Sequence, residues 1–195
     1  MKLVIIKYNS GNVAGVRFAL QRLGIDAMWT DDSEEIFSAD KIIFPGVGNA
    51  ASAMGSLKET GLDKILPGIR QPFLGICAGM QLMCTHSEEG DVDCLGIVPL
   101  KVKKFENKKG LKVPHTGWDT ISQLKGPLFK DIREEEYMYF VHSYFVSTGS
   151  DSVAICNYGI PFTAALQRNN FYGVQFHTEL SAEAGSRILQ NFLNL

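Results

Sequence analysis

The stretch FLGICAGMQ, residues 73–81, decides the fold of this chain. An apolar run of strand type leads into Gly-x-Cys-x-Gly, and a helix-like stretch follows over residues 78–84. A strand, a glycine-flanked nucleophile and a helix together form the pattern of a nucleophile elbow, here with cysteine. The two glycines allow the backbone to turn sharply and to pack closely. The pattern therefore predicts an α/β sheet with Cys77 at the carboxyl end of one strand.

Upstream of this turn, segments of strand and helix character alternate. Such a β-α-β-α order implies a parallel sheet with helices on both faces, whose ligands bind beyond the carboxyl ends of the strands. The loop Pro45-Gly46-Val47-Gly48 lies at another such end. Strands are expected at 2–7, 26–29, 41–44 and 73–76, and helices at 12–23, after an N-cap at Ser33, and at 50–66.

Downstream of the turn the pattern changes to short strands. Their connections are too short for crossover helices, so several of these strands are expected to be antiparallel. An amphipathic helix over Ala182–Leu193 follows them. We therefore expect one domain over 1–195, built on a mixed central sheet with extra antiparallel strands in its second half. The strands are expected at 98–104, 112–116, 137–141, 144–147, 152–157, 162–167 and 171–176.

Composition restricts the class of function. The 195 residues carry a net charge of −2, which gives no support for binding nucleic acid or an anionic membrane. No export signal and no apolar run of membrane-spanning length is present. The four cysteines have no C-x-x-C spacing and no neighbouring His pair, so no metal site is expected. Reduced thiols in the cytoplasm are the expectation.

Cys77 has two interpretations on this motif alone: a reactive thiol at a helix start, or a buried cysteine in a tight turn. A nucleophile needs a base, and His86, expected to be exposed, is a poor candidate. His177 follows a predicted strand, and Glu179 lies two residues further, on the same side of an extended segment. Glu179 is thus placed to orient the imidazole, as in Ser-His-Asp systems. A solvated His and Glu in a loop is the alternative, which the elbow disfavours.

Cys77 in GICAGMQ and His177 with Glu179 in FHTE resemble the triad amidotransferases of class I, whose core is a flavodoxin-like α/β domain. Further segments are similar to the glutaminase subunit of imidazole glycerol phosphate synthase, an enzyme of histidine biosynthesis, and together they span nearly the whole chain. These segments are residues 8–12 (YNSGN), 45–48 (PGVG), 114–118 (PHTGW) and 139–144 (YFVHSY).

The resemblance implies that Cys77 attacks the side-chain amide of glutamine and that ammonia passes to a (β/α)₈-barrel synthase subunit, which forms imidazole glycerol phosphate and AICAR. It implies no cofactor. It also assigns roles: the backbone of Val47, Gly48 and Ala78 would form the oxyanion hole, Gln81, Glu89, His142, Ser143 and Tyr144 would bind glutamine, and Trp118 and Asp119 would face the partner.

Some residues depart from the family pattern. Thr178 replaces a proline between His177 and Glu179, Lys7 and Asn9 replace an acid and a glycine, and Asp119 replaces an asparagine. These departures leave open a paralogue that supplies ammonia to a sugar-modifying synthase. A thiol hydrolase of the same fold would not need the glutamine-binding set. A non-catalytic, partner-binding subunit would not need the triad.

Overall fold

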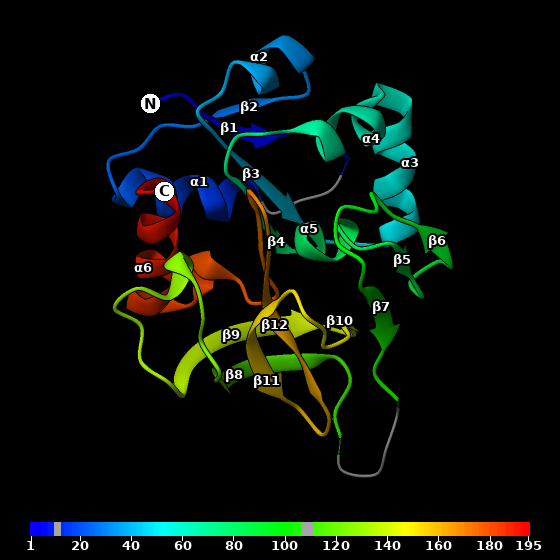
Figure 1. Cartoon of the computed structure of the whole chain (residues 1–195), viewed down its shortest axis with the longest axis vertical. Helices are drawn as coiled ribbons and strands as arrows, with labels where there is room; N and C mark the ends of the chain where they lie inside the picture. Colours follow the sequence, from blue (N-terminus) through cyan, green and yellow to red (C-terminus); the bar gives the residue numbers. More distant parts are fainter. Residues whose placement is uncertain (10–12, 107–110) are drawn as a thin grey trace.

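The computed structural model describes residues 1–9, 13–106 and 111–195. Its centre is a mixed sheet whose parallel half has the order β2-β1-β3-β4-β13 (Figure 1). The order 2-1-3-4 followed by the last strand is the doubly wound arrangement of flavodoxin-like sheets. The predicted α/β class is therefore confirmed. These five strands are Met28–Thr30, Leu3–Ile6, Lys41–Gly46, Phe73–Cys77 and Phe171–Val174.

The sheet continues beyond β13 through β12, β10, β7, β5 and β6, and β11 also pairs with β12. All of these pairings are antiparallel except that of β5 with β7, so the predicted change of character in the second half is confirmed. A separate antiparallel ribbon joins β8 to β9. The bounds are His86–Ser87 (β5), Val92–Asp93 (β6), Lys101–Lys104 (β7), His115–Ile121 (β8), Glu136–His142 (β9), Tyr144–Val146 (β10), Ser152–Asn157 (β11) and Pro161–Arg168 (β12).

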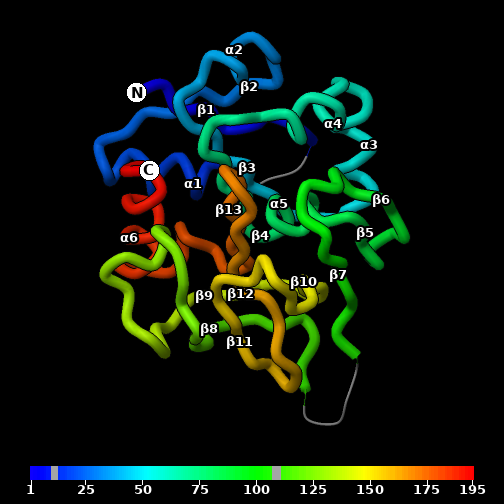
Figure 2. The backbone as a smooth tube through the Cα atoms, in the orientation of Figure 1, coloured from blue at the N-terminus to red at the C-terminus, as the bar shows by residue number. Residues whose placement is uncertain are grey.

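Helices cover both faces of the parallel strands because each strand is apolar on both sides. Leu3 and Ile5 of β1 belong to the apolar cluster that includes α1 and α6, whereas Val4 and Ile6 belong to the cluster that includes α3, α4 and α5. Figure 2 shows α1 and α6 together on one side of the sheet and α3 to α5 on the other. The helices are Val13–Arg22 (α1), Ser33–Phe37 (α2), Ala50–Thr60 (α3), Leu62–Ile65 (α4), Ala78–Leu82 (α5) and Ala182–Leu193 (α6).

Several predicted boundaries are wrong. The helix predicted at 50–66 breaks at Gly61, whose φ of 73° ends α3, and a short 3-10 turn, Leu66–Gly68, follows α4. The N-cap of α2 is Asp32, not Ser33, because the Asp32 carboxylate accepts hydrogen bonds from two backbone N–H groups of the first turn. The two-residue strands β5 and β6 were not predicted.

Residue 12, where a helix start was predicted, lies outside the described residues, as do residues 10 and 11 of the YNSGN segment.

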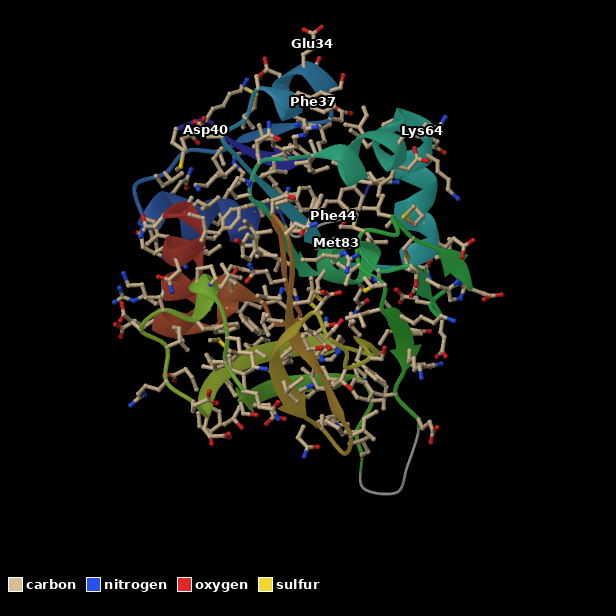
Figure 3. All side chains as sticks on the ribbon, in the orientation of Figure 1. Glu34, Phe37, Asp40, Phe44, Lys64 and Met83 are labelled. Atoms are coloured by element: carbon tan, nitrogen blue, oxygen red, sulfur yellow. The ribbon has the colours of Figure 1, made fainter. Side chains whose placement is uncertain are left out.

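Side chains follow the layers of the fold: Phe44 and Met83 lie in the interior, whereas Glu34 projects from the outer end of the molecule (Figure 3). Within the described part of the chain, no helix is both long enough and apolar enough to cross a bilayer.

Candidate active site

The site is built on the turn from β4 to α5. Cys77 ends β4 and has φ 52° and ψ −113°, a conformation that side-chain-bearing residues rarely adopt. Glycines permit the close approach around it: a Cβ on Gly79 would lie 1.8 Å from the carbonyl oxygen of Phe44, and a Cβ on Gly46 would lie 2.5 Å from the nitrogen of Gly79. The predicted elbow is thus held by backbone packed directly against backbone.

Three groups surround the Cys77 sulfur. His177 interacts with it, and this interaction raises the pKa of the imidazole. The sulfur also lies 3.9 Å from the Val141 carbonyl oxygen and 3.7 Å from Nε2 of Gln175. These neighbours come from β9 and from the end of β13, about 60 to 100 residues further along the chain. The fold therefore brings the predicted base to the predicted nucleophile.

His177 is oriented by Glu179, whose Oε1 lies 2.9 Å from Nδ1 of the imidazole. This leaves Nε2 for Cys77. The segment after His177 is a 3-10 turn, Thr178–Leu180, and not an extended strand, so the predicted contact forms by a different backbone route. Burial lowers the pKa of His177, but its interactions with Cys77 and Glu179 outweigh burial and raise the pKa to about 10.

A cavity of about 540 Å³ opens beside these groups. It contains Cys77 and His177 and every residue predicted for the oxyanion hole and for glutamine binding. Glu179 lies behind His177 with its side chain almost completely buried. Sequence reasoning missed four lining residues. The cavity is lined by Val47, Gly48, Asn49, Cys77, Ala78, Gln81, Glu89, Pro114, Val141, His142, Ser143, Tyr144, His177 and Leu180.

The polar groups predicted to bind glutamine are already engaged with protein atoms. Gln81 Nε2 donates to the backbone oxygen of Tyr144 and to Oε1 of Gln175, both at 2.8 Å, which leaves its Oε1 for a ligand. Glu89 accepts a hydrogen bond from the N–H of Ala50 at the start of α3, and burial raises the pKa of its carboxyl group. Each residue thus offers one oxygen to the cavity.

His142 is held by a chain of hydrogen bonds under the cavity. Its Nδ1 lies 2.7 Å from the Tyr144 carbonyl oxygen and therefore carries the proton, so its Nε2 accepts from Nδ1 of His115 at 3.1 Å. His115 Nε2 lies 3.4 Å from Asp119. Burial lowers the pKa of His142 to about 3, so the ring is neutral. Its side chain is a structural support for Tyr144.

The two residues predicted to face a partner point in different directions. Along β8, Trp118 is half exposed and its ring packs edge-on against Tyr139, with 5.6 Å between centroids. Asp119 is next in the strand and so faces the opposite side, toward His115 and Cys156. The Tyr139 carbonyl oxygen accepts a 2.9 Å hydrogen bond from the backbone N–H of His177. Tyr139 therefore connects the two: its ring contacts Trp118, and its backbone is hydrogen-bonded to His177.

The other ionisable clusters lie elsewhere. His86 is half-buried, not exposed as predicted, and contacts Asp91 and Asp93 on the surface. Within the described residues, no group of three or more His, Cys, Asp or Glu side chains is arranged to hold a metal ion. The chemistry that this cavity offers is therefore that of a thiol, an imidazole with its carboxylate, and backbone N–H groups.

Comparison with known proteins agrees with this geometry. Residues 8–195 match the family model of the class-I glutamine amidotransferases. The chain is 55% identical to imidazole glycerol phosphate synthase subunit HisH of Bacteroides fragilis, over the whole of both chains. It is 52% identical to the subunit of the same name in Bacteroides thetaiotaomicron, again over both whole chains. For the subunit in Vibrio parahaemolyticus the identity is 47%, over the whole of this chain and 98% of that one.

Solved structures share the fold at low sequence identity. One glutamine amidotransferase superposes with a TM-score of 0.76 at 18% identity, over the whole of this chain and 98% of that one. A second glutamine amidotransferase, from Thermotoga maritima, superposes with a TM-score of 0.64 at 14% identity, over the whole of this chain and 83% of that one. The predicted amidotransferase fold is confirmed.

Proposed function

The chain belongs to the class-I glutamine amidotransferases and is an enzyme that hydrolyses glutamine, the glutaminase subunit of imidazole glycerol phosphate synthase, and from this premise we propose that the cavity beside Cys77 is where glutamine is hydrolysed. One observation carries the proposal: a thiol at a strained strand-to-helix turn shares a cavity with an imidazole that is hydrogen-bonded to a buried carboxylate.

In this mechanism Cys77 is the nucleophile and His177 the proton carrier. His177 takes the thiol proton on Nε2, and Glu179 stabilises the resulting imidazolium through Nδ1. The thiolate attacks the side-chain carbonyl of glutamine, and His177 returns the proton to the departing ammonia. Water then hydrolyses the γ-glutamyl thioester to glutamate. The raised pKa of His177 supports this assignment, because an imidazole that holds its proton beside a thiolate is ready to protonate the leaving group.

Backbone N–H groups stabilise the oxyanion that forms during the attack. Ala78 begins α5, so its N–H belongs to a helix start, where an anion is favoured. Val47 and Gly48 follow β3 directly and line the same cavity. Gly48 has a φ of 94°, which a residue with a side chain adopts only under strain, so glycine keeps this loop able to turn its N–H toward the substrate.

Glutamine is held by the groups that keep one free oxygen in the cavity. Gln81 accepts from the substrate amide through Oε1, and Glu89 pairs with the α-ammonium group. Ser143 and Tyr144 contribute backbone and side-chain polar atoms at the other wall. A thiol hydrolase of other specificity would have no reason to place a carboxylate such as Glu89 in the same cavity as the nucleophile.

Ammonia made here is passed to a partner subunit. Free ammonia is protonated and diluted in water, so a covered outlet is needed. Apolar side chains exposed around the cavity support a docking surface: Val47, Val141 and Leu180 line the cavity, and Trp118 lies beside them across Tyr139. The partner is a (β/α)₈-barrel synthase that forms imidazole glycerol phosphate and AICAR in the cytoplasm. The relatives' names favour this role over supply to a sugar-modifying synthase.

The test is Cys77→Ala in the assembled enzyme. Loss of the nucleophile should lower glutamate formation by more than about a thousandfold. The partner should still form product when ammonium salts replace glutamine. Cys94→Ala is the matched control, because Cys94 is a partly buried thiol outside the cavity. Normal glutamine turnover by Cys77→Ala would remove the assignment.

A further inference from the structure

Gln175 is a polar side chain that the mechanism above does not use. It has no solvent exposure, and its Nε2 lies 3.7 Å from the sulfur of Cys77, within hydrogen-bonding range for sulfur. Its Oε1 accepts a 2.8 Å hydrogen bond from Gln81. A buried amide with both ends engaged, one of them on the nucleophile, has a function beyond filling space.

The orientation of this amide follows from its neighbours. The Tyr144 carbonyl is a pure acceptor, so the Gln81 atom that contacts it at 2.8 Å is nitrogen. That same nitrogen contacts the side chain of Gln175, so the contacted atom of Gln175 is oxygen. The remaining end of Gln175, which faces Cys77, is therefore the NH₂ group. The Tyr144 carbonyl thus fixes the orientation of both amides, and the NH₂ group of Gln175 is the donor to the Cys77 sulfur.

The sequence places this donor by simple alternation. Gln175 precedes His177 by two residues in extended chain, so both side chains project from the same side. The backbone N–H of Gln175 bonds the Ala164 oxygen at 2.8 Å, which extends the β12–β13 ladder to this point. Gly173, two residues earlier on that side, leaves room for α5, because a Cβ there would lie 2.5 Å from Met80 Cγ. The base and the amide therefore reach Cys77 together.

We propose that Gln175 is a positioning residue for the nucleophile: its amide N–H donates to the Cys77 sulfur, fixes the sulfur beside His177 and favours the thiolate over the thiol. A donor to a charged acceptor stabilises it more than a donor to a neutral one. The inference rests on the proposed role of Cys77. It adds that thiolate stabilisation is shared between His177 and a neutral amide.

A purely structural role is the competing explanation. Gln175 also holds Gln81, and its loss would loosen the Gln81–Tyr144 contact without any effect on the thiol itself. The two roles differ in what they change. A structural role affects stability and KM, whereas donation to the sulfur affects the ionisation of the thiol and kcat.

The test compares two substitutions in the full chain bound to its synthase partner. Gln175→Glu keeps an oxygen for Gln81 but replaces the NH₂ group by a second oxygen. Gln175→Met removes both contacts at similar volume. Asn191→Leu is the control, since Asn191 is another buried amide, which bonds the Leu128 and Lys130 carbonyls in the α6 region. The readouts are the pH profile of Cys77 alkylation by iodoacetamide, kcat and KM for glutamine, and the melting temperature.

We expect Gln175→Met to move the alkylation profile about one unit toward alkaline pH, so that the rate on the acidic limb of the profile falls about tenfold, as for losing one hydrogen bond to a charged acceptor. Gln175→Glu should slow alkylation more than this and lower kcat at least about tenfold, with KM within about threefold, since Gln81 keeps its partner. Asn191→Leu should lower the melting temperature and leave the alkylation profile unchanged.

The proposal is overturned if both Gln175 variants alkylate with the wild-type profile. If Cys77→Ala still hydrolyses glutamine, the proposed function fails as well. If the Gln175 variants fold poorly, a measurement on the unsubstituted chain still tests the proposal. In the unsubstituted full chain, the side-chain amide proton resonances of Gln175 should shift with pH at the midpoint of the alkylation profile. They should lose that shift in Cys77→Ala. Resonances that are insensitive to thiol ionisation would contradict the proposal.

Discussion

Gly79→Ala is the substitution for which the structure predicts the largest local cost. A Cβ at this position would lie 1.8 Å from the carbonyl oxygen of Phe44, whereas real Cβ contacts almost never fall below 3.0 Å. The two backbones must therefore separate by more than about 1 Å, and neither is a flexible side-chain end. Overpacking of this kind costs about 1–3 kcal/mol, and we expect the upper end because backbone must move.

In a chain of this length, 3 kcal/mol corresponds to a fall in melting temperature of roughly 6–12 °C. Phe44 lies in β3, which runs directly into the Val47–Gly48 loop, so activity should fall as well. Gly55→Ala is the matched control, because it lies in α3 with no heavy atom within 4 Å of the added Cβ. There the same substitution should stabilise the protein by about 0.5–1 kcal/mol. Melting curves measured by circular dichroism test both. Equal shifts for the two variants would refute the packing argument.

Three further predictions use single substitutions. Glu179→Gln should lower kcat about a hundredfold or more in the assembled enzyme, since the amide cannot stabilise the His177 imidazolium as a carboxylate does; turnover within twofold of wild type would contradict this. Asp32→Ala should destabilise the protein by about 1 kcal/mol in urea titrations and Ser33→Ala by much less; the reverse order would restore Ser33 as the cap. The folded-state pKa of His142, about 3, lies below the unfolded value of 6.5, so its contribution to stability is complete above pH 6.5 and lost as pH falls toward 3. The loss is up to about 1.4 kcal/mol per pH unit. In denaturant titrations, the free energy of unfolding of His142→Gln should therefore depend less on pH than that of wild type; an equal pH dependence of the two proteins would contradict the lowered pKa of His142.

The sequence predicts the parallel half of the sheet well because its signals are local. Short apolar runs such as residues 3–6 and 42–44 are typical of strands covered on both faces, and the glycines at 75 and 79 mark the turn. The errors occur where the structure depends on residues that lie outside any short stretch of sequence. Ser33 and Asp32 are both acceptable caps by residue type, and only the path of the chain selects Asp32. Strand β5 exists because β7 supplies its hydrogen-bond partners, and β6 exists because β5 does; their own two-residue sequences carry no strand signal.

The candidate site also contains both residues that the sequence predicts and residues that it does not. Cys77, His177 and Glu179 are recognisable because each role needs one residue type at a fixed place, and the fold brings all three together. Gln175 was missed because a glutamine in a predicted strand carries no chemical signal of its own. Its position two residues before His177 was the available signal, since alternation places it on the same side. Pro114 and Leu180 line the cavity through contacts that depend on where distant strands meet, which spacing along the chain cannot show.

Both halves of the chain contribute to the surroundings of the Cys77 thiol. Activity should therefore depend on the centre of the sheet, where the two halves meet. The first half supplies the strained turn at Cys77, whose backbone conformation costs about 1–3 kcal/mol unless its surroundings hold it. The imidazole and the amide that contact the sulfur come from the segment after β13, which lies between β4 and β12 in the sheet. If β13 left the sheet, the base and the amide would leave together, and the turn would lose the strand that packs beside it. The proposed catalytic arrangement therefore forms only when the central pairing of β4 with β13 is complete, and it should resist local opening as strongly as the core does.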